Sequence, residues 1–334
     1  MNQFVQLSLL FILALISSSL LTRILIKKLS YLGVVDKPGD RRAHKKITPR
    51  GGGLSVVAVL IIGFIAFEYL STNVLIESQK IIPIFSLIAA ISFLDDLKTI
   101  RVFFRLITHL ICAGLSIYLF LYPRLLFHGL FPMGIDFILA TICLVGFLNI
   151  YNFLDGIDGI TAAESIHLSI TLLILCYLRF NTIINVNFII AIATITLACS
   201  IGFLIFNWHP AMIFLGDVGS ISLGFLIGLC LLLISASTIE LFIASGIASL
   251  YYIADGSLTI FIRLINKERI WQPHLKHFFQ KAIKKGMTQK QVVHRIIICN
   301  SLLMVFSISS LVYPVISSIL AATIVMVTLI NFAR

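Results

Sequence analysis

Charged residues are scarce in this 334-residue chain. They make up 12%, against 59% hydrophobic residues, and the mean hydropathy is +1.07. Soluble globular proteins carry roughly 25% charged residues, so a soluble enzyme, a disordered chain and a secreted disulfide scaffold are all excluded. The six cysteines stand singly in apolar stretches, without a CxxC pair or a metal-like spacing, and we interpret them as small buried hydrophobic residues.

The chain also lacks internal repeats and the short alternating segments of a membrane β-barrel. What it has is a series of long apolar runs, and a spanning helix needs about 20 such residues. We predict an all-α, polytopic membrane protein, with residues 1–334 forming one integral domain. The first run lacks a basic leader and a cleavage site, so we expect a retained transmembrane helix. Eleven spans are predicted: 4–26, 54–70, 81–95, 102–122, 135–154, 160–178, 183–206, 218–237, 241–262, 295–313 and 315–332.

The basic residues gather in alternate loops between these spans. Nine of the 25 Lys and Arg residues lie in 23–50, three in 98–105 and nine in 263–295, and Arg334 ends the chain. The positive-inside rule then predicts an outer N-terminus and a cytoplasmic C-terminus. The net charge of +11 indicates topology and contact with anionic lipid rather than nucleic acid. The predicted cytoplasmic loops lie near 27–53, 95–101, 155–159, 207–219 and 263–294.

Five aspartates stand at apolar helix ends or in short connections on this predicted cytoplasmic side. An Asp at the centre of a membrane helix costs about 2.5–3.5 kcal/mol, so we expect a cluster at the membrane boundary. The adjacent pair Asp95-Asp96 would repel by roughly 4 kcal/mol at ~4 Å with an effective dielectric constant near 20. A hard divalent cation would relieve this repulsion, and Mg²⁺ is usually bound together with substrate phosphates. Simple solvation of the pair is the alternative.

Residues 149–159, with the sequence NIYNFLDGIDG, carry the densest polar pattern. Asn149 and Asn152 share one face of a predicted helix end, and Asp155 extends that face by one turn. Glycines then end the helix, with Asp158 between them. Amide and carboxylate oxygens at this spacing suit a hard cation or a nucleotide, and packing of the amides is the alternative.

Three further segments are candidates for binding anions. The Gly-Asp-Val-Gly-Ser stretch places Asp217 at a predicted helix N-terminus, where anions bind or where the side chain simply caps the helix. His274 and His277 would share one helical face and hydrogen-bond phosphate, or belong to an amphipathic surface helix. The first loop pairs Lys45 and Lys46 with a glycine-rich segment, as a phosphate cradle or a topology signal.

Taken together, these stretches resemble the polyprenyl-phosphate N-acetylhexosamine-1-phosphate transferases (glycosyltransferase family 4), which include the phospho-MurNAc-pentapeptide translocases. The stretches that match, in family order, are KKITPRGGG (45–53), FLDD (93–96), 149–159, GDVGS (216–220) and His274-x-x-His277. This family uses Mg²⁺, with Mn²⁺ as a substitute, to transfer a sugar 1-phosphate from a UDP-sugar to undecaprenyl phosphate, with release of UMP.

The resemblance implies a role for each of these residues. It makes Asn152 and Asp217 metal ligands and Asp95, Asp96 and Asp155 catalytic. It further implies contacts to nucleotide, pyrophosphate or acceptor phosphate, made by Lys45, Lys46, Asn149, Asp158, His274 and His277. A phosphate oxygen is already anionic near neutral pH, so we favour direct attack by the acceptor over a covalent aspartyl-phosphate.

Departures from the family pattern indicate a branch. The pentapeptide translocases carry a denser histidine triplet and usually ten spans. His-x-x-His and eleven predicted spans are more similar to the branch that initiates O-antigen and enterobacterial common antigen, whose donors are UDP-GlcNAc or a related UDP-N-acetyl sugar. The expected partners are such a donor, undecaprenyl phosphate and the bacterial inner membrane. The sequence leaves the sugar, the later glycan and a homodimer open.

Rival classes fit the residues less well. A CDP-alcohol phosphotransferase needs Ala-Arg after its first Asp-Gly, whereas Ile157 and Asp158 follow Asp155-Gly156 here. An ion-coupled transporter needs binding groups near the middle of the membrane and often inverted repeats. A structural anchor needs no cluster of acidic and amide groups.

Overall fold

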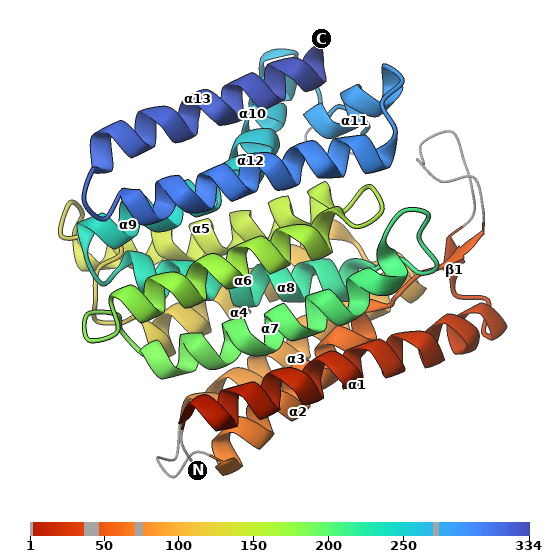
Figure 1. The fold of residues 1–334 in the computed structure, drawn as a ribbon, viewed down its shortest axis with the longest axis horizontal. Helices are drawn as coiled ribbons and strands as arrows, with labels where there is room; N and C mark the ends of the chain where they lie inside the picture. The colour runs from red at the N-terminus through yellow and green to blue at the C-terminus, as the bar shows by residue number, and fades with distance from the viewer. Residues whose placement is uncertain (1–2, 37–46, 71–75, 270–273) are drawn as a thin grey trace.

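The computed structural model describes residues 3–36, 47–70, 76–269 and 274–334. These residues form thirteen α-helices and one antiparallel pair of short strands (Figure 1). The first elements are α1 (Gln3–Tyr31), β1 (Val35–Asp36), β2 (Thr48–Pro49), α2 (Gly53–Leu70), α3 (Ile76–Leu97), α4 (Val102–Phe120) and α5 (Met133–Leu154). The remaining helices are α6 (Ile160–Leu178), α7 (Val186–Asn207), α8 (Asp217–Ser235), α9 (Ile239–Ala248), α10 (Leu250–Ile265), α11 (Phe278–Lys284), α12 (Gln289–Ser309) and α13 (Pro314–Ala333).

The helical, polytopic architecture predicted from the sequence is confirmed, but the predicted number of spans is not reached. Within the described ranges, eight helices are long and apolar enough to cross a membrane, and the bent pair α9–α10 would be a ninth. The predicted spans 54–70 and 81–95 correspond to α2 and α3, which fall outside this set. In α3 the apolar stretch is short because polar residues occupy its first turns and Asp95 and Asp96 its last.

The predicted span 241–262 is not one straight helix. It breaks at Ser249 into α9 and α10, which are bent by 70°. Gly246 and two serines, Ser245 and Ser249, surround the break. Ser249 Oγ donates to the Ser245 carbonyl at 2.9 Å. Sharp kinks commonly occur at such Gly/Ser positions.

Helix α8 forms the centre of the bundle. Nearly all of its residues are buried, and α2, α3 and α5 pack around it. The outermost helices in Figure 1 are α1 and α2 on one side and α12 and α13 on the other. A central helix that is apolar on every side is typical of a membrane bundle, in which small residues allow close packing.

A close approach in this core joins the start of α2 to the start of α8. The amide of Gly53 donates to the Leu215 carbonyl at 2.8 Å. A Cβ atom on Gly53 would overlap the backbone of Gly219. Both positions therefore need glycine, and the contact sets the distance between the two helices at the end where β1 and α11 also lie (Figure 1).

We expect Gly53→Ala to lower the free energy of unfolding by about 1–3 kcal/mol, the usual cost of overpacking. The measurement is the melting temperature of the purified protein in detergent. Gly146→Ala is the matched control, because Gly146 lies within α5 and a Cβ added there would have no atom of the described residues within 4 Å. Equal melting temperatures for the two variants would contradict the close contact.

Candidate functional site

The site is built on a backbone contact between two segments that are distant in sequence. Residues 49–53 run alongside 213–215: the Phe214 amide donates to the Pro49 carbonyl at 2.8 Å, and the Gly52 amide donates to the Phe214 carbonyl at 2.9 Å. This pairing places the Arg50 side chain beside the first turn of α8. Arg50 Nη2 lies 2.7 Å from Asp217 Oδ1.

Asp96, from the end of α3, caps the N-terminus of α8. Its carboxylate accepts hydrogen bonds from the amides of Asp217 (2.9 Å) and Val218 (3.0 Å), and Arg50 Nε lies 2.8 Å from its Oδ1. A carboxylate at this position is stabilised by unpaired N–H groups and the helix dipole. Gly216 has φ +76°, and a Cβ there would lie 2.6 Å from Asp96 Oδ2, so only glycine allows this approach.

Asp95 turns to different partners. It accepts a hydrogen bond from the Ile100 amide at 2.6 Å and pairs with Arg105. Arg105 also lies 3.5 Å from Asp217 Oδ2. Two arginines and backbone amides therefore relieve the repulsion of the adjacent acids.

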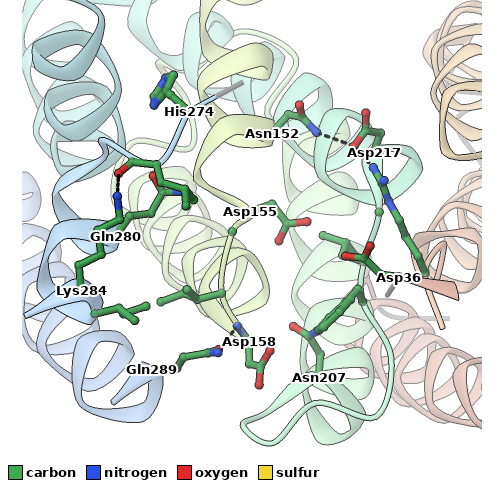
Figure 2. Close-up of a pocket in the computed structure, with 18 residues that line it drawn as sticks. Asp36, Asn152, Asp155, Asp158, Asn207, Asp217, His274, Gln280, Lys284 and Gln289 are labelled. Carbon is green, nitrogen blue, oxygen red and sulfur yellow. Dashed lines mark hydrogen bonds and ion pairs between the residues drawn. The ribbon is translucent and has the colours of Figure 1, made fainter. Parts of the chain in front are cut away.

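Asn152 completes this network from the end of α5. Its Nδ2 donates to Asp217 Oδ1 at 3.2 Å and to Ser220 Oγ at 2.9 Å. Figure 2 shows the two side chains facing one another, joined by the first of these hydrogen bonds. The ends of α3, α5 and α8 and the segment before α2 thus converge on Asp217.

Next to this network lies a cavity of about 430 Å³ (Figure 2). The predicted site residues Asn152, Asp155, Asp158, Asp217 and His274 all line it. Other polar and charged side chains in its lining are Asp36, Arg50, Asn207, Gln280, Lys284 and Gln289. The lining thus combines carboxylates, amides and cationic groups, which suits an anionic ligand held together with a cation.

Asp155 follows α5 directly and points into the cavity (Figure 2). Burial, followed by the negative charge of Asp217, raises the pKa of its carboxyl to about 7, from the ordinary value of 3.8. A carboxyl in this position exchanges its proton near neutral pH. A cation or a cationic part of a ligand in the cavity would favour its ionised form.

Asp158 serves mainly to connect segments. Its Oδ2 lies 2.6 Å from His209 Nδ1 and accepts from the Ala211 amide at 3.1 Å. Its backbone amide donates to Gln289 Oε1 at 2.9 Å. The loop between α5 and α6 is therefore held to the loop before α8 and to the start of α12.

The two predicted histidines have different surroundings and do not share a helical face. His277 is the residue before α11 and is 2% exposed, with Nδ1 at 3.1 Å from Asp255 Oδ1. His274 lies in the preceding loop and lines the cavity. Burial, followed by the neighbouring His277, lowers the pKa of His274 to about 4. His274 is therefore neutral at pH 7 and can offer a hydrogen bond rather than a charge.

The remaining predicted residues do not line the cavity or are not described. Asn149 donates to the Val145 carbonyl of its own helix at 2.7 Å and is not part of the cavity lining. Lys45 and Lys46 lie outside the described residues. Asp95 and Asp96 stand behind the cavity and reach it only through Arg50, Arg105 and Asp217.

The sequence did not predict the contribution of Arg50 and Arg105. It also did not predict that Gln280, Lys284 and Gln289 line the cavity. Arg50 belongs to the glycine-rich segment, and in the sequence Arg105 contributes only to the topology signal. An arginine beside an apolar helix start has no obvious solvent role, which is a usable signal for a buried ion pair. Gln280, Lys284 and Gln289 gave no such signal, because amides and lysines are common in surface helices.

No three His, Cys, Asp or Glu side chains within the described ranges converge as a ready-made metal site. Fold and site together define a multi-pass membrane protein with a polar, carboxylate-rich cavity at one end of its helix bundle.

Comparison with known proteins shows which family and which relatives the chain resembles. Residues 78–235 match glycosyl transferase family 4. The chain is 28% identical over 319 residues to the probable undecaprenyl-phosphate N-acetylglucosaminyl 1-phosphate transferase of Bacillus subtilis (strain 168), covering 90% of this chain and 83% of that protein. It is also 28% identical over 334 residues to the phospho-N-acetylmuramoyl-pentapeptide-transferase of Syntrophus aciditrophicus (strain SB), covering 90% and 91%. The chain is therefore similar to glycosyl transferase family 4 over residues 78–235, the segment that contains Asp95, Asp96, Asn152, Asp155 and Asp217.

The raised pKa of Asp155 predicts how stability depends on pH. The folded carboxyl keeps its proton up to about pH 7, whereas the unfolded carboxyl loses it near 3.8. The folded state therefore binds more protons between these values, and the contribution of Asp155 to stability decreases as pH rises through this window and is constant above it.

We expect the melting temperature of the unmodified protein, relative to Asp155→Asn, to fall between pH 5 and pH 7.5 in metal-free buffer. Comparison of the two proteins removes the effect of every other titrating group. Parallel curves for the two proteins would show that Asp155 titrates at its ordinary pKa.

Proposed function

We propose that this protein transfers an N-acetylhexosamine 1-phosphate from a UDP-sugar to undecaprenyl phosphate, giving a polyprenyl-diphosphate-sugar and UMP. The observation that carries the proposal is the convergence of Asn152, Asp155 and Asp217 on one cavity whose far wall holds His274 and Lys284. The names of the relatives, which act on undecaprenyl phosphate or transfer a phospho-sugar, support the same class of reaction.

Charge balance supports a divalent cation in this cavity. Among the described residues, the carboxyl groups of Asp95, Asp96, Asp155 and Asp217 outnumber the guanidinium groups of Arg50 and Arg105 that pair with them. One Mg²⁺ would offset this excess. Mg²⁺ prefers one or two carboxylates and completes its shell with water and substrate phosphates, so the small protein donor set fits it.

Asp217, with Asn152 and Asp155, would hold this cation. The Asn152 amide would present its oxygen in place of the nitrogen that now faces Asp217, and oxygen and nitrogen of an amide exchange by a simple flip. When bound, Mg²⁺ would neutralise charge on the pyrophosphate of the donor. Arg50 and Arg105 keep Asp217 ionised and fixed in orientation by their ion pairs.

The reaction needs positioning more than proton transfer. An oxygen of the acceptor phosphate attacks the donor phosphorus that carries the sugar, and the bond from that phosphorus to the bridging oxygen breaks, so UMP leaves with the electron pair. The attacking oxygen is already anionic near neutral pH, so electrostatic stabilisation supplies most of the catalysis. Neutral His274 and cationic Lys284 are placed to hydrogen-bond phosphate oxygens from the opposite wall.

Direct attack is also favoured by how the carboxylates are engaged. Asp96 caps α8, Asp95 pairs with Arg105, and Asp217 Oδ1 is shared by Arg50 and Asn152. A carboxylate held in this way is a poor nucleophile. Asp155 faces the cavity more openly, and its role as a cation ligand accounts for its position without an aspartyl-phosphate.

The proposed orientation places the cavity in the cytoplasm, where UDP-sugars are available. Arg50 and Lys284 line the cavity and Arg105 lies beside it, and all three belong to basic loops that are cytoplasmic by the positive-inside rule. The N-terminus would then be outside, the C-terminus cytoplasmic, and the lipid acceptor would come from the inner leaflet.

The first experiment is a micelle assay that follows UMP release. We expect UMP only when undecaprenyl phosphate, Mg²⁺ and a UDP-N-acetylhexosamine such as UDP-GlcNAc are all present, and no UMP when the metal is chelated. Release with UDP-MurNAc-pentapeptide alone would instead assign the protein to the pentapeptide translocases and overturn the proposed branch, in which the product initiates O-antigen or a similar glycan. Absence of UMP with every donor, from folded protein, would contradict the transferase proposal.

A substitution at Asp217 tests the metal assignment. We expect Asp217→Asn to lower kcat at least a hundredfold, the usual cost of losing one electrostatic group that acts in the transition state. Asp136→Asn is the matched control, because Asp136 is a buried carboxylate at the other end of the bundle that accepts from the amides of Leu126 and Phe127. The control variant should have a lower melting temperature and an unchanged kcat. Near-normal kcat in Asp217→Asn would refute the metal assignment.

A further inference from the structure

A second buried carboxyl lies apart from the cavity, inside the helix bundle. Glu164 stands in the second turn of α6 and is 0% exposed, and Asn300 stands in the middle of α12 and is 2% exposed. Asn300 Nδ2 donates to Glu164 Oε2 at 2.6 Å. Acidic residues inside membrane helices are costly and rare, and those that occur generally have a specific partner.

The described surroundings of Glu164 offer it no positive charge. Its titratable neighbours are Tyr151, Tyr251, Tyr252 and Cys299, and no salt bridge to Glu164 is formed within the described ranges. An ionised Glu164 would therefore be a buried charge with one hydrogen bond, which is among the most destabilising arrangements in a protein.

The two unsatisfied atoms of the pair are complementary once one proton is added. Glu164 Oε1 and Asn300 Oδ1 are both buried, and neither has a hydrogen-bond partner among the described residues. Both are acceptors when the carboxyl is ionised. A proton on Oε1 changes that atom into a donor, and Asn300 Oδ1 is the acceptor available to it.

We propose that Glu164 permanently holds a proton and forms a neutral acid–amide ring with Asn300. In this ring Nδ2–H donates to Oε2 and Oε1–H donates to Oδ1. A single proton thereby satisfies both orphan atoms and removes the buried charge.

The ring acts as a positioning device for the cavity. Helix α6 begins directly after the loop that carries Asp155 and Asp158, and α12 begins at Gln289, which accepts a hydrogen bond from the Asp158 amide. Glu164 and Asn300 join the same two helices deeper in the bundle. Two attachment points fix both the position and the tilt of α6 against α12, and with them the wall of the cavity that Asp155 and Gln289 share.

Infrared spectroscopy of the full-length protein in detergent tests the proton directly. At pH 7, the difference spectrum between the unmodified protein and Glu164→Gln should contain the carbonyl stretch of a protonated carboxyl, shifted to lower frequency in D₂O. Asp136→Asn is the matched control, because Asp136 is a buried carboxylate that accepts from two backbone amides, and it should leave this band in place. A difference spectrum that contains only the stretches of an ionised carboxylate would overturn the proposal.

The positioning role is tested by variants that keep or break the ring. Glu164→Gln preserves both hydrogen bonds as an amide–amide pair, and we expect its melting temperature to be unchanged and its kcat/KM to stay within twofold. Asn300→Leu breaks both bonds and should lower kcat/KM at least tenfold and lower the melting temperature. If Glu164→Gln lowers the melting temperature and kcat/KM as much as Asn300→Leu does, a charge is required and the proposal is overturned.

The kcat/KM readout rests on the proposed transferase function, whereas the infrared and melting measurements do not. An inactive but folded protein would therefore refute the transferase and leave the protonated pair to be decided by its spectrum.

Discussion

The structure depends on how the N-terminus of α8 is neutralised. This helix is the buried centre of the bundle, and its first turn leaves amide groups without helical partners at the edge of an apolar environment. Asp96 supplies the acceptor, and Arg50 and Arg105 supply the compensating charge for Asp96, Asp95 and Asp217. Because these partners come from four separate segments, one electrostatic requirement holds together the elements that form the cavity.

The remaining buried carboxyls meet the same constraint by other means. Asp136 is paired with two backbone amides at the opposite end of the bundle, Asp255 with the amides at the start of α11 and with His277, and Glu164 with Asn300. Asp155 and Asp217 differ from these carboxyls because they line a cavity. A membrane protein tolerates acidic groups where a ligand or an ion completes the charge balance, which is why this arrangement is evidence for function.

The sequence predicted the local features of the fold and site well, because they depend on neighbouring residues. Apolar runs predicted the helices, and the Gly-Asp-Val-Gly-Ser pattern predicted that Asp217 would begin a helix. The sequence could not predict contacts between residues that are far apart along the chain. Arg50 meets Asp217 across 167 positions of the chain, and His277 faces Asp255 instead of the cavity because the segment before α11 is not helical. The number of spans is smaller than predicted partly because the chain bends at Ser249 and because the apolar part of α3 is short.

Residues of one acidic motif therefore have different physical tasks. Asp95 and Asp96 are adjacent in sequence, yet one is bound to the connection between α3 and α4 and the other to the start of α8. Loss of either would displace an arginine from Asp217 and so change the cavity without any direct contact to a substrate. Strong loss of activity on mutating such an aspartate is thus compatible with a purely electrostatic and positional role. What distinguishes Asp155 and Asp217 from that pair is that their carboxylates line the space in which a cation and a pyrophosphate would meet.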